Sequence, residues 1–295
     1  MSFGLSEGAR AFISDPANHD TRAADPSLIP SWRAEALAAA EAAAPGILAA
    51  TGCTTEQAEI GGRPALEIIP PAEDSTPILY IYGGGFYGGS PLEDLAISAV
   101  LAAETGARVI SPTYRLAPED PFPAGLDDVT AAMAAMAAAG RYQVAAESAG
   151  GNLALVAVAR MLARGLPGPE QLACMSPAGD LTGHYAPWEE GCDPLLSTSQ
   201  GRMVPELYAP GLDRSTPEIS PVNLSFGPDW PPTLITTGTR DLLAGMCARL
   251  SRAMRVGGAP VELRLWDGMW HVFEAYPVPE AKASLSEIAA FLRAG

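Results

Sequence analysis

One short segment, residues 146–151, constrains the fold of this chain more than any other feature. It reads Ala-Glu-Ser-Ala-Gly-Gly, follows a short apolar run at 142–145, and opens an apolar stretch at 152–163 without proline or glycine. A strand, a sharp turn of small residues and a helix together expose a serine as a nucleophile. The turn requires small residues two positions either side of Ser148, and Ala146 and Gly150 stand there. The segment predicts a strand–serine–helix elbow.

Strand-like and helix-like segments alternate along most of the chain. The predicted strands are residues 66–69, 77–82, 108–113, 142–146, 171–175, 233–237 and 261–266. The predicted helices are residues 31–44, 92–105, 126–139, 149–163, 242–256 and 280–293. Strands alternating with helices of this length are typical of βαβ units. We therefore expect an α/β protein whose central sheet is mostly parallel and is flanked by helices.

A base for the serine has to come from one of only three histidines. His19 lies in a polar N-terminal stretch, and His184 lies among Gly, Pro and Trp. His271 instead follows the strand-like run 261–265, in a loop after a late strand. That is the position of the base in a Ser…Asp/Glu…His order. His271 is the predicted general base, although a single histidine taken alone is more often an ordinary surface or core residue.

The acid candidate is Asp241, which comes just after the apolar run 233–237 and before a predicted helix. Taken alone, an aspartate in this position is more often a helix N-cap than a catalytic acid. For Ser148 alone, the odds of an N-cap and of a nucleophile are about even. The joint pattern changes the interpretation, because Ser148, Asp241 and His271 all follow strands and occur in the required order. The sequence thus favours a catalytic triad.

A glycine-rich loop occurs where the same chemistry needs hydrogen-bond donors. The apolar run 78–82 leads straight into three glycines, residues 83–85. Acyl transfer places negative charge on a carbonyl oxygen, and backbone N–H groups aimed at that oxygen stabilise it. A phosphate-binding loop is the alternative, but the chain lacks the G-x-x-x-x-G-K-[ST] pattern and has no lysine near the loop. We interpret the loop as an oxyanion hole.

These motifs together resemble those of the hormone-sensitive-lipase-like branch (bacterial family IV) of the α/β-hydrolases, which carry H-G-G-G-[FW] and G-D-S-A-G-G. Further strings that match the family lie at 114–124, 193–196, 219–221, 238–243 and 269–273. The resemblance covers nearly all of the chain from about residue 64 onward. It implies an α/β-hydrolase fold and a serine carboxylesterase that hydrolyses small to medium acyl esters through an acyl-enzyme intermediate.

The resemblance also assigns roles residue by residue. It implies Ser148 as nucleophile, Asp241 as the orienting acid and His271 as base. It further implies that the oxyanion is bound by the backbone N–H groups of Gly84, Gly85 and Ala149.

The chain departs from the family pattern at four positions, none of which removes a reacting group. Tyr82 stands where the motif has histidine, Glu147 where the elbow has Asp, and Ala146 where it has Gly. Asp120 stands where histidine is frequent. Together these departures indicate an outlying subgroup with an unusual substrate or a slow reaction on generic esters.

Two segments do not follow the alternation of strands and helices, and in the resembled family they form a cap over the active site. The expected division is an N-terminal cap segment 1–52, a cap insertion 179–211, and a catalytic domain made of 53–178 and 212–295. An apolar acyl group needs a dry, aromatic-lined cover, although cap aromatics can equally form the core of the cap. The expected pocket residues are Tyr82, Phe86, Tyr87, Glu147, Trp188, Met203, Tyr208 and Trp270.

Composition limits the partners of the chain. A net charge of −16 and a pI near 4.5 argue against nucleic acid and anionic membranes. The N-terminus lacks a signal-peptide pattern, and no apolar run reaches about 18 residues. The four cysteines show no C-x-x-C and histidines are few, so we expect free thiols in a cytoplasmic protein and neither metal nor cofactor. The expected partner is a small-molecule ester; a homodimer is plausible from the family alone.

Two alternatives stay open at the level of sequence. The resembled family includes plant hormone receptors that keep the fold but lose the catalytic histidine, so a ligand-binding protein is conceivable. The presence of His271 argues for an enzyme, whereas Tyr82 leans the other way. The second alternative keeps the chemistry but changes the substrate to an amide, lactone or carbonate, since one triad serves them all.

Overall fold

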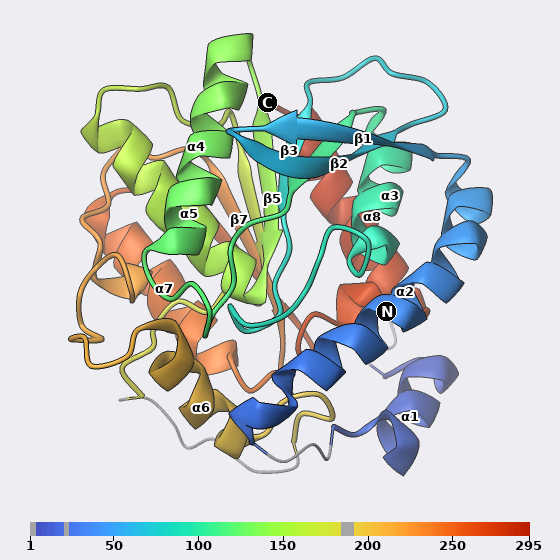
Figure 1. The fold of residues 1–295 in the computed structure, drawn as a ribbon. Helices are drawn as coiled ribbons and strands as arrows, with labels where there is room; N and C mark the ends of the chain where they lie inside the picture. Colours follow the sequence, from blue (N-terminus) through green and yellow to red (C-terminus); the bar gives the residue numbers. More distant parts are fainter. Residues whose placement is uncertain (1–3, 21–23, 184–191) are drawn as a thin grey trace.

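A computed structural model describes residues 4–20, 24–183 and 192–295 (Figure 1). Its centre is a sheet of eight strands in the order β1-β2-β4-β3-β5-β6-β7-β8. The strands are β1 (Thr54–Ile60), β2 (Arg63–Ile69), β3 (Ile78–Ile81), β4 (Val109–Pro112), β5 (Gln143–Glu147), β6 (Leu172–Met175), β7 (Thr233–Gly238) and β8 (Val261–Trp266). All pairs from β4 to β8 are parallel, while β2 pairs antiparallel with both β1 and β4. The expected mostly parallel α/β sheet is confirmed.

Helices cover both faces of this sheet. Helices α4, α5 and α7 lie on one side, and α3 and α8 lie on the other (Figure 1). Their bounds are α3 (Leu95–Thr105), α4 (Ala124–Ala139), α5 (Ser148–Ala163), α7 (Ala244–Gly257) and α8 (Pro279–Arg293). Strands β3, β5, β6 and β7 are buried along their whole length as a result. A strand covered on both faces needs a continuous apolar run, which explains why the sequence predicted these four strands well.

Strand β1 was not predicted from the sequence. Its residues alternate between exposed and partly buried positions, and its sequence Thr-Thr-Glu-Gln-Ala-Glu-Ile is largely polar. It joins β2 through Gly61 and Gly62, whose φ angles are 60° and 76°. A two-residue turn with positive φ at both positions matches the right-handed twist of a hairpin. The Gly-Gly pair was thus the missed hairpin signal at the edge of the sheet.

Three helices gather at the lower end of the view in Figure 1: α1 (Glu7–Ser14), α2 (Ile29–Thr51) and α6 (Thr198–Tyr208). Helix α2 was predicted over 31–44 only, but it continues through Pro45 and ends where Gly52 takes a left-handed conformation. Neither α1 nor α6 was predicted. Helix α6 contains Gly201 and Pro205, which disfavour a helix, and it starts with a capping box between Ser197 and Gln200.

Short 3₁₀ turns complete the fold: η1 (Pro16–Asn18), η2 (Pro26–Leu28), η3 (Pro221–Asn223) and η4 (Phe273–Ala275). Cys53, Cys174 and Cys247 are buried free thiols. Among the helices of the described residues, none is long and apolar enough to cross a membrane. The division of the chain at residues 52, 178 and 211 stays a prediction.

Candidate active site

The elbow predicted from residues 146–151 forms between β5 and α5. Strand β5 ends at Glu147, and Ser148 is the first residue of the helix. Ser148 has a φ of 50°, a left-handed conformation that is uncommon outside glycine. A Cβ atom on Gly150 would lie 2.2 Å from the carbonyl oxygen of Ile81, so no larger residue fits there. Ala146, two residues before the serine, is fully buried within β5.

The structure brings the three predicted reacting residues together. Ser148 Oγ lies 2.9 Å from His271 Nε2, and His271 Nδ1 lies 3.0 Å from Asp241 Oδ1. Each side chain follows a different parallel strand: Ser148 follows β5, Asp241 follows β7 and His271 follows β8. Carboxyl ends of parallel strands meet at one edge of a sheet, which is why residues so distant in sequence converge.

Asp241 is buried and surrounded by donors. Its Oδ2 accepts a hydrogen bond from the Thr237 hydroxyl at 2.7 Å, and its Oδ1 accepts the Leu243 N–H at 2.8 Å. Burial opposes ionisation of this carboxyl, but His271 and the surrounding donors outweigh it and hold the pKa of Asp241 below its ordinary value. The side chain is thus an ionised acceptor facing the imidazole.

His271 is only 6% exposed and sits among several carboxylates. Burial alone would lower the pKa of His271, yet the negative charges of Asp241, Asp193 and Glu274 overcome this and raise it above its ordinary value. Glu274 itself is buried and accepts hydrogen bonds from the Thr236 and Ser284 hydroxyls. The arrangement favours an imidazole that takes up a proton readily.

The glycine-rich loop leaves β3 and curls back on itself beside the serine. The carbonyl of Gly84 accepts the N–H groups of Tyr87 at 3.2 Å and Gly88 at 2.8 Å, which closes a tight turn. Gly84, Gly85 and Ala149 all line the same cavity as Ser148. The three predicted oxyanion-hole residues and the nucleophile therefore line one cavity.

Tyr82, the residue in place of the motif histidine, lies behind this loop rather than in the cavity. Its ring stacks on Tyr114 with centroids 4.3 Å apart, and its hydroxyl accepts the Tyr114 N–H at 3.3 Å. The Tyr114 hydroxyl in turn donates to the carbonyl oxygen of Tyr82 at 2.8 Å. Tyr82 is fully buried and is absent from the lining of the cavity in which it was expected. The tyrosine pair braces the base of the loop instead.

A pair of buried carboxyl groups, Glu147 and Asp94, supports the loop from below. They hydrogen-bond to each other and to the backbone of Gly83, and the Tyr80 hydroxyl donates to Asp94 Oδ2 at 2.9 Å. Burial, followed by the charge of Asp94, raises the pKa of Glu147 well above its ordinary value. Burial also raises the pKa of Asp94 to about 6. Of the two side chains, Glu147 is therefore the one that favours its protonated form, with a hydrogen bond directed to Asp94.

Replacing Glu147 with glutamine is expected to flatten the pH dependence of stability. The folded protein holds the Glu147 proton while the unfolded chain releases it, so wild-type stability falls as pH rises above the ordinary pKa of glutamate. This loss amounts to as much as about 1.4 kcal/mol per pH unit for one proton. Glutamine keeps a donor toward Asp94 and has no proton to lose.

Urea denaturation from mildly acidic to alkaline pH measures this effect. Glu56→Gln on the exposed side of β1 serves as the matched control, and it should keep the wild-type slope. An identical slope for wild type and Glu147→Gln would contradict a protonated Glu147.

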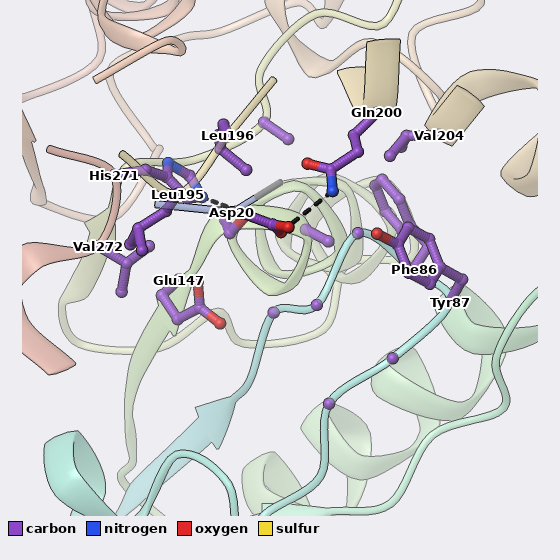
Figure 2. A pocket seen from close by; sticks show the side chains of 18 of the residues that line it. Asp20, Phe86, Tyr87, Glu147, Leu195, Leu196, Gln200, Val204, His271 and Val272 are labelled. Atoms are coloured by element: carbon purple, nitrogen blue, oxygen red, sulfur yellow. Dashed lines mark hydrogen bonds between the residues drawn. The ribbon is translucent and has the colours of Figure 1, made fainter. Parts of the chain in front are cut away.

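The cavity above the serine has a volume of about 380 Å³. Of the residues expected to line it, Phe86, Tyr87 and Glu147 do so. Figure 2 shows the Phe86 and Tyr87 side chains on one side of the cavity and His271 on the other. Trp188 lies outside the described residues.

Three other residues expected in the pocket lie outside its lining, because each packs in a neighbouring core. Tyr208 stacks on Phe86 with ring centroids 3.8 Å apart, and thus supports the wall without forming it. Trp270 is fully buried against Phe12 of α1, with centroids 4.3 Å apart. Met203 belongs to a small cluster between α2 and α6. The structure thus places Met203, Tyr208 and Trp270 behind the cavity lining.

Much of the lining comes from residues that the sequence did not single out. They are contributed by the N-terminal segment, α2, the stretch before α6, α6 itself, α7 and the loop after β8. They include Asp20, Ile29, Trp32, Arg33, Ala36, Leu195, Leu196, Gln200, Val204, Met246, Val272 and Tyr276. Only the aromatic and apolar residues of the two expected cap segments offered a signal, and it did not distinguish lining from core.

Two polar contacts join these segments across the cavity. Asp20 points into the space between His271 and Gln200 (Figure 2), and its Oδ2 accepts the Gln200 side-chain N–H at 3.0 Å. Its backbone N–H donates to the Pro194 carbonyl. Asp20 thereby ties the N-terminal segment to the residues around α6.

Arg33 ties α2 to the glycine-rich loop. Its guanidinium donates to the carbonyl oxygens of Tyr87 and Ala117, both at 2.7 Å, and pairs with Glu119 at 2.9 Å. The Tyr87 end of the loop is therefore fixed to a cap helix as well as to its own turn.

Comparisons with known proteins agree with this geometry. A family model described as the α/β-hydrolase fold matches residues 78–275. An acetyl-hydrolase of Streptomyces hygroscopicus is 33% identical over 242 residues, which cover 79% of this chain and 81% of the relative. The carboxylesterase NlhH of Mycobacterium tuberculosis is 34% identical over 247 residues, 76% of each chain.

Solved structures extend the similarity to almost the whole chain. A hormone-sensitive lipase from a metagenome library is 30% identical and superimposes with a TM-score of 0.84. The match covers 98% of this chain and 97% of the lipase. The chain therefore belongs to the α/β-hydrolase family, within its hormone-sensitive-lipase-like branch of carboxylic ester hydrolases.

Proposed function

We propose that this protein is a serine carboxylesterase that hydrolyses small to medium acyl esters through a Ser148–His271–Asp241 triad and an acyl-enzyme intermediate. One observation carries the proposal: the Ser148 Oγ–His271 Nε2–Asp241 chain of contacts at 2.9 Å and 3.0 Å opens into a cavity of about 380 Å³. A positioned nucleophile and base beside a substrate-sized cavity are the requirements of nucleophilic acyl transfer.

The reaction proceeds in two halves. His271 Nε2 removes the proton from Ser148 Oγ as the oxygen attacks the ester carbonyl, and Asp241 stabilises the resulting imidazolium. The N–H groups of Gly84, Gly85 and Ala149 bind the oxyanion. The imidazolium returns its proton to the departing alcohol, which leaves an ester between the acyl group and Ser148. Water then attacks this ester, with His271 again as base, and the free acid leaves.

The size of the cavity supports an acyl group of small to medium length. Its volume of about 380 Å³ lies at the lower end of the roughly 300–1,000 Å³ common among small-molecule sites. Its walls carry aromatic side chains, including Trp32, Phe86 and Tyr87, together with aliphatic ones such as Leu196 and Val204. Such a lining favours an uncharged acyl chain.

Hydrolysis of p-nitrophenyl acetate, butyrate, octanoate and laurate tests this proposal. We expect the highest kcat/KM for acetate or butyrate and a clear fall for octanoate and laurate, because the cavity cannot bury a long chain. The butyryl amide matched to the butyrate ester should react far more slowly. A folded protein that hydrolyses none of the four esters would refute the proposed activity, and faster turnover of the amide would reassign the substrate class.

A further inference from the structure

Asp193, a buried carboxylate outside the triad, contacts the backbone of both loops that carry its acid and base. Its Oδ2 accepts the His271 N–H at 3.2 Å and the Leu242 N–H at 3.0 Å. Its Oδ1 accepts the Leu195 N–H at 2.9 Å, which fixes the carboxylate in a local turn. Asp193 is 5% exposed and is absent from the cavity lining, so it reaches the reaction only through other residues.

The backbone at His271 needs such support because the next residue is strained. Val272 has a φ of 46°, a left-handed conformation that is a true outlier for a β-branched side chain. Strained backbone of this kind persists only where the surroundings fix it firmly. The contacts that do so are the Asp193 bond to the His271 N–H and a 3.3 Å bond from the Val272 N–H to the Ser176 hydroxyl.

The second contact lies just before helix α7. The first N–H groups of a helix have no acceptor within it, and α7 has no side-chain cap at Leu243. Asp241 accepts the N–H of Leu243, the residue at the N-cap, and Asp193 accepts the N–H of Leu242, one residue earlier. The loop that aims Asp241 at His271 is thus held from both sides.

The charge of Asp193 also acts on the imidazole. The groups that face His271 are Asp241 from the loop after β7, Asp193, Glu274 from η4 and the Ser148 hydroxyl. Burial lowers the pKa of His271, and the carboxylates, Asp241 foremost and Asp193 next, raise it. Removing the charge of Asp193 should therefore let the pKa of His271 fall.

We propose that Asp193 is a positioning residue of the hydrolysis, which holds His271 and the Asp241 loop at their working distance and places a second negative charge beside the imidazole. The inference rests on the proposed function of the triad. It assigns to the Asp-Pro-Leu-Leu string at 193–196 a role in the reaction beyond its place in the fold.

Asp193→Asn and Asp193→Ala test this role in the full-length protein. Either variant should lower kcat on p-nitrophenyl butyrate by about tenfold to a hundredfold, since small misplacements of a reacting group cost about that much. KM should change little, because Asp193 does not line the cavity. The acid limb of the kcat/KM profile should move to lower pH. If the alanine variant does not fold, the asparagine variant still decides the outcome.

Asp180→Asn is the matched control. Asp180 is also buried and makes the same kind of turn, accepting the Thr182 N–H at 2.9 Å, but it pairs with Arg249 rather than with the His271 loop. This variant should lose stability without any shift in the pH profile. A shift in both variants would show that the profile responds to general loosening and would overturn the proposal.

NMR titration of histidine labelled with ¹³C and ¹⁵N separates this inference from the proposed activity. The chain has only three histidines, so the His271 signals can be assigned with a His271→Gln variant. In Asp193→Asn, His271 should titrate at lower pH than in the wild type, whether or not the test ester is a substrate. An unmoved titration, or an unchanged kcat with only KM altered, would overturn the positioning role. If the folded wild-type protein hydrolyses none of the test esters, the proposed function is refuted instead.

Discussion

Replacing Ser148 with alanine is expected to lower kcat/KM for p-nitrophenyl butyrate by about 10⁶-fold, with the fold intact. The reason is that Ser148 Oγ is the atom 2.9 Å from His271 Nε2 and is the proposed nucleophile. Rate enhancement from the oxyanion hole and from binding should leave a residual rate above that of water. Steady-state kinetics together with circular dichroism of the purified variant measure both parts of this expectation.

Ser148→Gly separates the chemistry from the backbone strain at the elbow. Both variants remove the hydroxyl, but only glycine accepts a φ of 50° without cost, so the glycine variant should unfold at higher denaturant than the alanine variant. The difference in unfolding free energy should be about 1 kcal/mol or more. Ser225→Ala at an exposed serine should keep full activity. Substantial hydrolysis by Ser148→Ala would rule out the nucleophile assignment.

The sequence predicted those parts of the site that depend on local chain geometry. The elbow at Ser148 needs small neighbours within a few residues, and the loop at 83–85 needs consecutive glycines after a strand, so both leave short patterns. The order of Ser148, Asp241 and His271 was readable because each follows a predicted parallel strand. The carboxyl ends of parallel strands lie at one edge of the sheet, so residues that follow such strands are expected to lie close together.

The sequence could not predict contacts made between distant segments. Asp193 meets His271 across 78 positions, and Asp20 meets Gln200 across 180. No periodicity marks a single carboxylate that accepts backbone N–H groups from another loop. Aromatic residues near motifs were equally ambiguous: Phe86 lines the cavity, whereas Trp270, adjacent to His271, faces the core against α1. Whether an aromatic side chain of a loop faces the cavity or the core depends on which helix packs behind that loop.

The departures from the family motifs become intelligible once these contacts are known. Tyr82 braces the loop through Tyr114, and the carboxyl group of Glu147 hydrogen-bonds to that of Asp94 beside Gly83. A longer acid at position 147 and a larger ring at position 82 thus occur together in the support of one loop. The substitutions alter how the loop is held, while Gly84 and Gly85 stay beside the nucleophile.

Replacing Asp241 with asparagine is expected to lower kcat by up to about 10⁴-fold, the loss that the same change causes in a serine-protease triad, where the histidine takes the wrong tautomer. The Leu243 N–H, 2.8 Å from Asp241 Oδ1, orients the amide so that its oxygen faces both this N–H and His271 Nδ1. The histidine should then keep the tautomer that leaves Nε2 free to accept the Ser148 proton. The fall in kcat therefore reflects the missing negative charge opposite the imidazolium rather than a change in the tautomer of His271.

A pH profile of kcat measures the loss of this charge. Burial lowers the pKa of His271, and the charge of Asp241 is the strongest influence that raises it. Without this charge, the pKa of His271 falls and the acid limb of kcat moves to lower pH. The charge is missing whichever tautomer His271 takes, so the ¹⁵N chemical shifts of its two ring nitrogens, measured by NMR, distinguish the kept tautomer from a reversed one. Asp267→Asn, on the same loop as His271 but bonded to Thr239, is the matched control and should behave like wild type. An Asp241→Asn enzyme that retains most of its kcat would show that another carboxylate, with Asp193 the nearest candidate, acts as the acid of this site.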